Sequence, residues 1–218
     1  MTALLRRLFF ACIARPLVII FFGLNIRHAQ RLPKTGPALI VANHNSHLDT
    51  LVLMALFPLR MLKDLRPVAA ADYFQRSKFL AWFSRHIIGV IFIDREGTSR
   101  ATFTAIGEAL EAGQLVIVYP EGSRGEPETL AEFKSGVSYL AQKHPDVPVI
   151  PIFLHGLGKA LPKTDWLPVP FFIDVFVGES HYIDPETGRG KAQRHAFMQT
   201  LNESMQALAS EGHFPAWE

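Results

Sequence analysis

The residues best suited to proton transfer in this chain are His44 and Asp49, which lie five positions apart between two apolar runs. On one straight helix this spacing would turn the two side chains away from each other. They can meet if His44 lies on a turn and Asp49 lies in the first turn of a helix with Ser46 as its N-cap, as in a capping box. Asp49 would then hold one imidazole nitrogen of His44, and the other nitrogen could take a proton from a substrate hydroxyl. The pattern therefore predicts a general-base pair.

A purely structural interpretation of the same turn stays open at this point. Asp49 could cap the helix and nothing more, with His44 as an ordinary loop histidine. His47 also competes for the same carboxylate, and the spacing alone favours the structural interpretation. Motifs farther along the chain are needed to decide between the two.

Two arginines follow other apolar runs in a similar way. Arg95 comes just past one predicted strand, and Arg124 lies in a glycine-framed turn after another. An arginine fork suits two-point recognition of a phosphate, and Gly122 would let backbone amides approach the anion. Alternatively, the arginines form structural ion pairs with Asp94 and Glu121. Two arginines at the edge that holds His44 are harder to explain in this way than one, so we expect a phosphate site.

The elements that must position these residues follow from an alternation of short apolar runs with amphipathic stretches. This alternation predicts a single α/β domain with a mostly parallel twisted sheet covered by helices. Ligands of open α/β sheets bind outside the carboxyl ends of the strands, so His44, Arg95 and Arg124 should share one edge. The predicted strands are 37–42, 67–71, 90–93, 115–119, 149–154 and 171–177, and the predicted helices are 51–56, 72–88, 98–112, 130–143 and 193–209.

Composition and charge exclude several classes of protein. The chain has 218 residues, of which 49% are hydrophobic and 19% charged, enough for one domain with a sizeable core. The net charge is only +2 and the lysines and arginines are dispersed, so we expect no nucleic-acid partner. The single cysteine, Cys12, excludes an internal disulfide and a cysteine-based zinc site. We expect neither a metal nor a cofactor.

Residues 1–27 form an apolar segment flanked by arginines. A helix from Leu8 to Leu24 would reach roughly 25 Å, which is less than the ~30 Å hydrocarbon core of a bilayer. Arg15 would be costly at mid-depth and Pro16 would kink the helix. We therefore expect a kinked membrane-associating helical segment at the cytoplasmic face of the inner membrane, followed by a catalytic domain over 28–218. A buried core helix and a signal peptide are the alternatives, although no small-x-small cleavage site follows the apolar run.

Four blocks of sequence, taken in order, resemble the glycerolipid acyltransferases, and most closely the 1-acylglycerol-3-phosphate acyltransferases. The resemblance extends from about Pro37 to Leu154 and is specific because all four blocks occur in the same order. It implies that His44 is the general base and that Asp49 orients it. The blocks are Asn43 to Asp49, Gly89 to Arg95, Pro120 to Arg124 and Val147 to Pro151.

The resemblance also implies the substrates. Arg95 and Arg124 would bind the acceptor's phosphate in a pocket shaped by Glu121, Gly122 and Ser123. The implied reaction moves a fatty acyl group from acyl-CoA or acyl-carrier protein to the free hydroxyl of a lysophospholipid, with 1-acylglycerol-3-phosphate as the best-matched acceptor and phosphatidic acid as the product.

One departure from the family leaves the acceptor's head group open. The third block usually continues as Thr-Arg-Ser after its glycine, whereas this chain reads Ser123-Arg124-Gly125-Glu126. Two other functions also remain open from the residues alone. A hydrolase of lipid esters or thioesters could use the same His-Asp pair to activate water, and a non-catalytic lipid-binding module could carry the same turn.

Overall fold

A computed structural model describes residues 2–74, 77–94, 99–125, 129–161, 167–184, 186, 190–212 and 214. Within these residues seven strands form one sheet in the order β1-β7-β6-β2-β5-β3-β4. The central strands β2, β5, β3 and β6 are mutually parallel where they pair, and only the β6–β7 pair is antiparallel. The predicted, mostly parallel sheet is therefore confirmed. The strands are β1 Leu24–Arg27, β2 Ala38–Ala42, β3 Leu65–Ala70, β4 Ile91–Ile93, β5 Leu115–Val118, β6 Val149–His155 and β7 Ile173–Val177.

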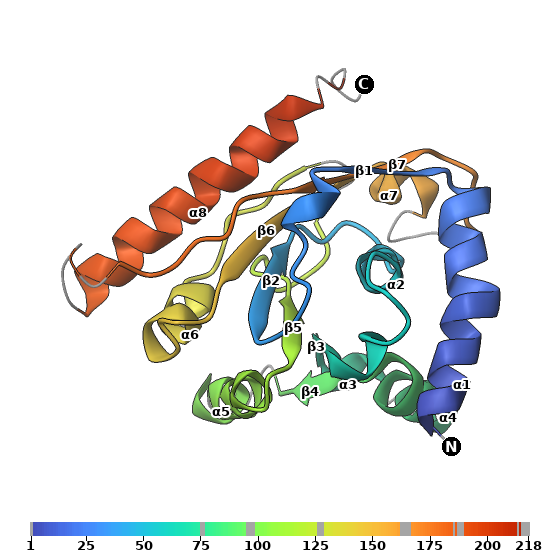
Figure 1. Cartoon of the computed structure of the whole chain (residues 1–218), viewed down its shortest axis with the longest axis horizontal. Helices are drawn as coiled ribbons and strands as arrows, with labels where there is room; N and C mark the ends of the chain where they lie inside the picture. The colour runs from blue at the N-terminus through green and yellow to red at the C-terminus, as the bar shows by residue number, and fades with distance from the viewer. Residues whose placement is uncertain are drawn as a thin grey trace.

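Helices cover both faces of this sheet (Figure 1). Alternate residues of β2 explain how: Ile40 packs with one hydrophobic cluster, while Leu39 and Val41 pack with the other. Because both faces are buried, β2 and β5 are apolar at every position, as expected for a covered parallel sheet. The α-helices are α1 Thr2–Phe9, α2 Asp49–Ala55, α3 Ala71–Phe74, α4 Lys78–Phe83, α5 Ser99–Glu111, α6 Gly136–Lys143, α7 Leu157–Ala160 and α8 Lys191–Glu211.

The two faces of the sheet carry different helices. One face is covered by α5, α6 and α8, and the predicted apolar stripe from Met198 to Leu208 of α8 is buried there. The other face is covered by α2 and by the long N-terminal helix (Figure 1). Short 3-10 and π-helical segments complete the chain: η1 Phe10–Ala14, η2 Leu17–Phe21, η3 Ala29–Arg31, η4 Leu62–Asp64 and η5 Ser84–Ile88.

The N-terminal segment forms one helical rod in which the π-helical segments η1 and η2 follow α1. Its buried residues recur every four positions. On an ideal helix of 3.6 residues per turn, residues at this spacing would gradually move around the helix axis. The wider π turns offset this rotation and keep the buried residues on one face. Phe10 and Phe22 at this spacing are among the most buried large side chains of the core. The full buried set is Arg6, Phe10, Ala14, Val18 and Phe22.

Two arginines fasten this helix to the rest of the fold. Arg6 is buried and its Nη2 donates hydrogen bonds to the carbonyls of Leu65, at 3.0 Å, and Ile88, at 2.6 Å. Arg15 donates through its own Nη2 to the carbonyl of Phe57. The buried face of the segment thus shares the core of the α/β domain, and its arginines bind backbone carbonyls. The boundary between 1–27 and 28–218 stays a prediction.

The opposite face of the same helix is apolar and exposed, with Leu8 at 49%, Ile13 at 56% and Ile20 at 80%. Across the described residues, no helix combines the length and the apolar character needed to cross a bilayer. The membrane association expected for this segment stays a prediction.

Two predicted helices and one strand differ from the expectation. The helix expected over 72–88 is found as α3 and as α4 continued directly by η5, and Ser77 caps the start of α4 by accepting a hydrogen bond from Leu80 N at 3.4 Å. The helix expected from residue 130 begins only at Gly136, since the preceding loop is tied to the third block by a bond from Lys134 N to Pro120 O of 3.0 Å. The strand β1 was not expected, because its residues fell within the predicted membrane segment.

Candidate active site

The turn between β2 and α2 brings His44 and Asp49 into contact. The His44 Nδ1 atom lies 2.8 Å from Asp49 Oδ2, so the predicted hydrogen bond is confirmed. The same carboxylate oxygen accepts bonds from the backbone N–H groups of Asn45, at 2.8 Å, and Ser46, at 2.9 Å. The Asp49 side chain is fully buried. These bonds fix the carboxylate, and the carboxylate in turn fixes the imidazole.

The predicted capping box is confirmed in its hydrogen bonds, although the helix itself begins only at Asp49, with Leu48 in the cap position. The Ser46 hydroxyl accepts a bond from Leu48 N at 3.3 Å and donates one to the carbonyl of Leu161 at 2.9 Å. The reciprocal bond, from the Ser46 backbone N–H to the Asp49 side chain, is also present. The carboxylate therefore has both roles that were weighed against each other: it closes the turn and it holds His44.

Tyr119 holds the flat face of the same imidazole. The two rings are stacked with centroids 4.1 Å apart and planes 20° apart. The Tyr119 hydroxyl lies 2.8 Å from Oγ1 of Thr50, the residue after Asp49. Burial raises the pKa of Tyr119 well above its ordinary value, so this phenol stays neutral. His44 is thus fixed at one edge and on one face, and Nε2 is the nitrogen that can exchange a proton with a substrate.

A cavity of about 650 Å³ opens at this edge of the sheet. It lies at the carboxyl ends of β3, β4 and β5, where an open α/β sheet is expected to bind its ligands. Its polar lining residues include His44, Arg124 and Lys134. Its apolar lining comes from β3, β5, α5 and α6. The apolar lining residues include Val68, Ala69, Phe103, Ile106, Val137 and Leu140.

The glycine-framed turn of the third block carries the polar part of this cavity. Gly122 has a φ of +77°, and a Cβ atom there would lie 2.5 Å from the Lys134 Nζ atom. Only glycine fits this position without displacing the ammonium group. Ser123 and Arg124 follow and also line the cavity. The next residue ties the two motifs together, because Gly125 N donates to the carbonyl of His44 at 2.9 Å.

Glu121 lies beneath this turn. It is buried, with 6% of its surface exposed, and its Oε1 accepts a bond from the His44 backbone N–H at 3.2 Å. Burial, only partly offset by this bond, raises its pKa to about 7. The alternative in which Glu121 pairs with Arg124 is not seen among the ion pairs of the described residues. Glu121 thus supports the backbone that carries His44.

His47 does not compete for Asp49 as the sequence suggested. It lines the cavity, and its Nε2 atom contacts Nη1 of Arg124. Partial burial, together with the positive charges near it, lowers the pKa of His47 to about 4. The imidazole is therefore neutral at ordinary pH and can accept a hydrogen bond from the guanidinium.

The structure brings together all but one of the predicted site residues. His44, Gly122, Ser123 and Arg124 line one cavity, with Asp49 and Glu121 packed behind it. Arg95 lies outside the described residues, as does Glu126. Within the described part of the chain there is no cluster of side chains that could hold a metal ion.

Sequence reasoning missed the contribution of Tyr119, the contact between His47 and Arg124, and the position of Lys134 over Gly122. The available signal for Tyr119 was its position directly after a buried strand, the same kind of position that pointed to Arg95. The other two contacts join residues far apart in the chain, and no local pattern reports them.

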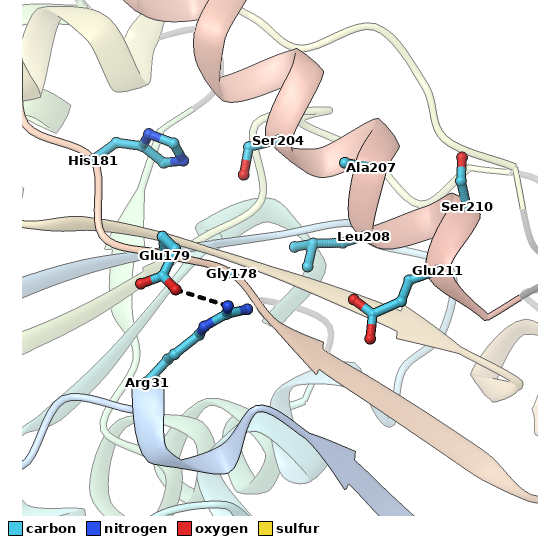
Figure 2. Close-up of a pocket in the computed structure, with 9 residues that line it drawn as sticks. All are labelled: Arg31, Gly178, Glu179, His181, Ser204, Ala207, Leu208, Ser210 and Glu211. Atoms are coloured by element: carbon cyan, nitrogen blue, oxygen red, sulfur yellow. Dashed lines mark ion pairs between the residues drawn. The ribbon is translucent and has the colours of Figure 1, made fainter.

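A second cavity, of about 540 Å³, lies beside α8 and the end of β7 (Figure 2). Arg31 and Glu179 form an ion pair there at 2.7 Å, as Figure 2 shows. Glu211, at the end of α8, pairs with His28 at 2.8 Å. This cavity contains His181 and two serines of α8 as well, so it has the residue types of a reactive site without the arrangement seen around His44.

Comparisons with known proteins show what this chain is similar to. The acyltransferase family profile matches residues 23–155, which is more than half of the chain. The human 1-acyl-sn-glycerol-3-phosphate acyltransferase beta is 33% identical over 144 residues, covering 61% of this chain and 47% of that protein. The 1-acyl-sn-glycerol-3-phosphate acyltransferase of Pseudomonas aeruginosa is 28% identical over 189 residues, covering 85% and 67%.

A solved structure shares the fold. The crystal structure of the 1-acyl-sn-glycerophosphate acyltransferase PlsC from Thermotoga maritima matches with a TM-score of 0.73 and 20% identity, over 99% of this chain and 81% of that one. The chain spans about half the length of the mammalian relatives that it matches.

Proposed function

Because this chain belongs to the acyltransferase family, we propose that it transfers a fatty acyl group from a thioester to the free hydroxyl of 1-acylglycerol-3-phosphate, giving phosphatidic acid. The observation that carries the proposal is the 2.8 Å contact between His44 Nδ1 and Asp49 Oδ2 at a cavity that also contains Arg124. The pair supplies a base, and the arginine supplies a means of holding a phosphate-bearing alcohol against that base.

The chemistry needs no nucleophile from the protein. His44 Nε2 takes the proton of the acceptor's hydroxyl while the hydroxyl oxygen attacks the thioester carbonyl carbon. The tetrahedral intermediate collapses, the carbon–sulfur bond breaks, and the leaving thiolate receives the proton from His44. Buried Asp49 stabilises the imidazolium that exists between these two steps and keeps the ring oriented. The chain has no Gly-x-Ser-x-Gly motif that would mark a serine nucleophile.

The phosphate of the acceptor would lie over the turn of the third block. Arg124 and Lys134 offer two cations beside Gly122, and Ser123 offers a hydroxyl. Arg95 is proposed as a further phosphate ligand on the basis of the sequence alone. Holding the phosphate places the hydroxyl against His44, so the gain is in orientation as much as in affinity.

The exposed apolar face of the N-terminal helix is the proposed membrane contact. It continues onto α4, where Phe79 and Trp82 are exposed, and α4 lies beside the start of α1 (Figure 1). At the other end of the helix, Phe172 covers Gly23 while remaining 78% exposed. A surface with exposed aliphatic and aromatic side chains suits the interfacial region of a bilayer. We propose that it lies in the cytoplasmic leaflet of the inner membrane.

A direct assay tests the proposed function and its rivals together. Purified protein is supplied with acyl-CoA or acyl-carrier protein and with lysophosphatidic acid, and phosphatidic acid and free fatty acid are measured in the same samples. Formation of phosphatidic acid supports the proposal and identifies the donor. Release of fatty acid that does not depend on the acceptor would indicate a hydrolase, and lipid binding without turnover would indicate a carrier.

A further inference from the structure

The contact between His47 and Arg124 joins the first and third blocks of the site. His47 lies on the turn that carries His44, and Arg124 lies on the turn that carries Gly122. The contact joins His47 Nε2 to Arg124 Nη1, and both residues line the cavity that contains His44. An arginine has only donors, so the imidazole nitrogen must be the acceptor and must carry no proton.

We propose that His47 is a positioning residue that holds the guanidinium of Arg124 in the orientation in which it receives the acceptor's phosphate. The inference rests on the proposed function, in which Arg124 is the phosphate ligand. It assigns to His47 a part in acceptor specificity and no part in proton transfer.

The physical reason is the flexibility of arginine. A long side chain loses considerable rotamer entropy when it is held in one conformation. If the side chain is ordered only when the substrate binds, this loss of entropy lowers the affinity for the substrate. A bond from Nη1 to His47 fixes the plane of the fork beforehand. Lys134, whose Nζ lies against Gly122, lines the same cavity.

The charge state of His47 agrees with this role. Partial burial and the nearby Arg124 and His44 lower the pKa of His47 to about 4, so the ring is an acceptor throughout the physiological range. A carboxylate at the same place would also bind Arg124, but it would neutralise the guanidinium and repel the phosphate. A neutral acceptor orients the cation without adding a negative charge that would repel the phosphate.

The test is a double-mutant cycle between His47 and Arg124. The variants are Arg124→Ala, His47→Leu, which removes the acceptor at similar volume, and His47→Gln, whose amide oxygen restores one. Each His47 variant is also combined with Arg124→Ala. KM and kcat for lysophosphatidic acid are measured for each, together with Kd for the same lipid by calorimetry and the Tm of each protein.

His47→Leu should raise KM and Kd for lysophosphatidic acid about three- to tenfold, in line with the loss of a charge-assisted hydrogen bond, with kcat near that of the wild type. His47→Gln should recover most of this loss. In the Arg124→Ala background, His47→Leu should have no further effect, because the residue acts only through the arginine.

The outcomes separate this inference from the proposed function. If the wild type transfers acyl groups and His47→Leu leaves KM and Kd unchanged, or changes them equally with and without Arg124, the positioning role is wrong and the function stands. If the wild type binds lysophosphatidic acid without turnover, the function is wrong, and the cycle in Kd still decides on His47. If it neither binds nor acylates the lipid, both proposals are wrong.

Discussion

The cavity beside α8 and the cavity at the carboxyl edge of the sheet contain nearly the same kinds of residue and connect them differently. In the cavity beside α8, Arg31 pairs with Glu179 at 2.7 Å and donates to the carbonyl of Val177 at 3.1 Å. Glu211 likewise pairs with His28. Opposite charges there neutralise one another and join η3, β7 and α8.

In the cavity at the carboxyl edge, the carboxylate of Asp49 holds a histidine by one nitrogen and closes a backbone turn, and Arg124 contacts a neutral imidazole. The difference shows that residue types alone do not make a reactive site. An ion pair between two surface groups satisfies both of them, whereas a buried carboxylate on one edge of an imidazole prepares the other edge to act. We therefore expect substitutions in the carboxyl-edge cavity to lower activity, and substitutions in the cavity beside α8 to leave activity unchanged.

The largest contrast should come from the carboxylates. Asp49→Ala should lower the transfer rate about a hundredfold or more, because the general base loses its orienting partner. It should also lower Tm, since three donors lose their acceptor. Glu179→Ala removes an acid that is 71% exposed and should change stability by no more than about 1 kcal/mol and activity not at all. Steady-state rates and melting curves of the two variants measure this contrast. Equal losses of rate and Tm in both variants would show that the two carboxylates do not differ in role.

The arginines should show the next largest difference. Arg124→Ala should lower kcat/KM for lysophosphatidic acid about ten- to a hundredfold, the scale of a lost charge-assisted contact. Arg124→Lys should recover little, because an ammonium group cannot reproduce the planar fork. Arg31→Ala is the matched control and should leave kcat/KM unchanged. A comparable loss in the control would mean that Arg124 also acts through the stability of the fold.

Tyr119 tests whether the face of His44 needs support. Tyr119→Phe retains the stacked ring and loses only the contact with Thr50, so we expect kcat to fall about twofold or less. Tyr119→Leu removes the stacking and should lower kcat about three- to tenfold, the equivalent of about 1 kcal/mol for an aromatic contact. If the two variants have the same kcat, stacking does not position the imidazole.

The smallest predicted effect concerns pH and Glu121. Its pKa is raised from 4.5 to about 7 in the fold, so the folded protein binds a proton that the unfolded chain has released. The stability gained in this way is present at low pH and is lost as pH rises through about 7. Between about pH 6 and about pH 8 the loss should be about 1 kcal/mol, and Glu121→Gln should remove that slope. Urea unfolding of both proteins at the two pH values measures it, and parallel slopes would show that Glu121 has an ordinary pKa.

The features that could be predicted from the sequence are those encoded by residues close together in the chain. The apolar run of β2 and the turn after it are local, and the sheet class and the His44–Asp49 contact were predicted correctly. The start of α2 was not, because Ser46 and Asp49 exchange the predicted bonds while the residues between them stay outside the helix. The stacking of Tyr119 on His44 depends on the β2–β5 pairing, which no local pattern contains.

The N-terminal helix shows a different limit. Its sequence favoured contact with lipid over burial in a core, and the structure places apolar residues on both sides. Phe10 is fully buried while Ile20, on the same rod, is 80% exposed. Only the tertiary packing separates the residues that belong to the core from those available to a membrane.

The most direct test of the account is the role of His44. Purified wild-type protein and His44→Ala are compared at equal concentration, after the Tm of the variant has been shown to equal that of the wild type. Each is supplied with a labelled acyl thioester and lysophosphatidic acid, and the initial rate of phosphatidic acid formation is measured. The account predicts that the wild type forms phosphatidic acid and that His44→Ala forms it about a hundredfold more slowly or worse, with binding of lysophosphatidic acid retained. Formation of phosphatidic acid by a folded His44→Ala protein at the wild-type rate would contradict it.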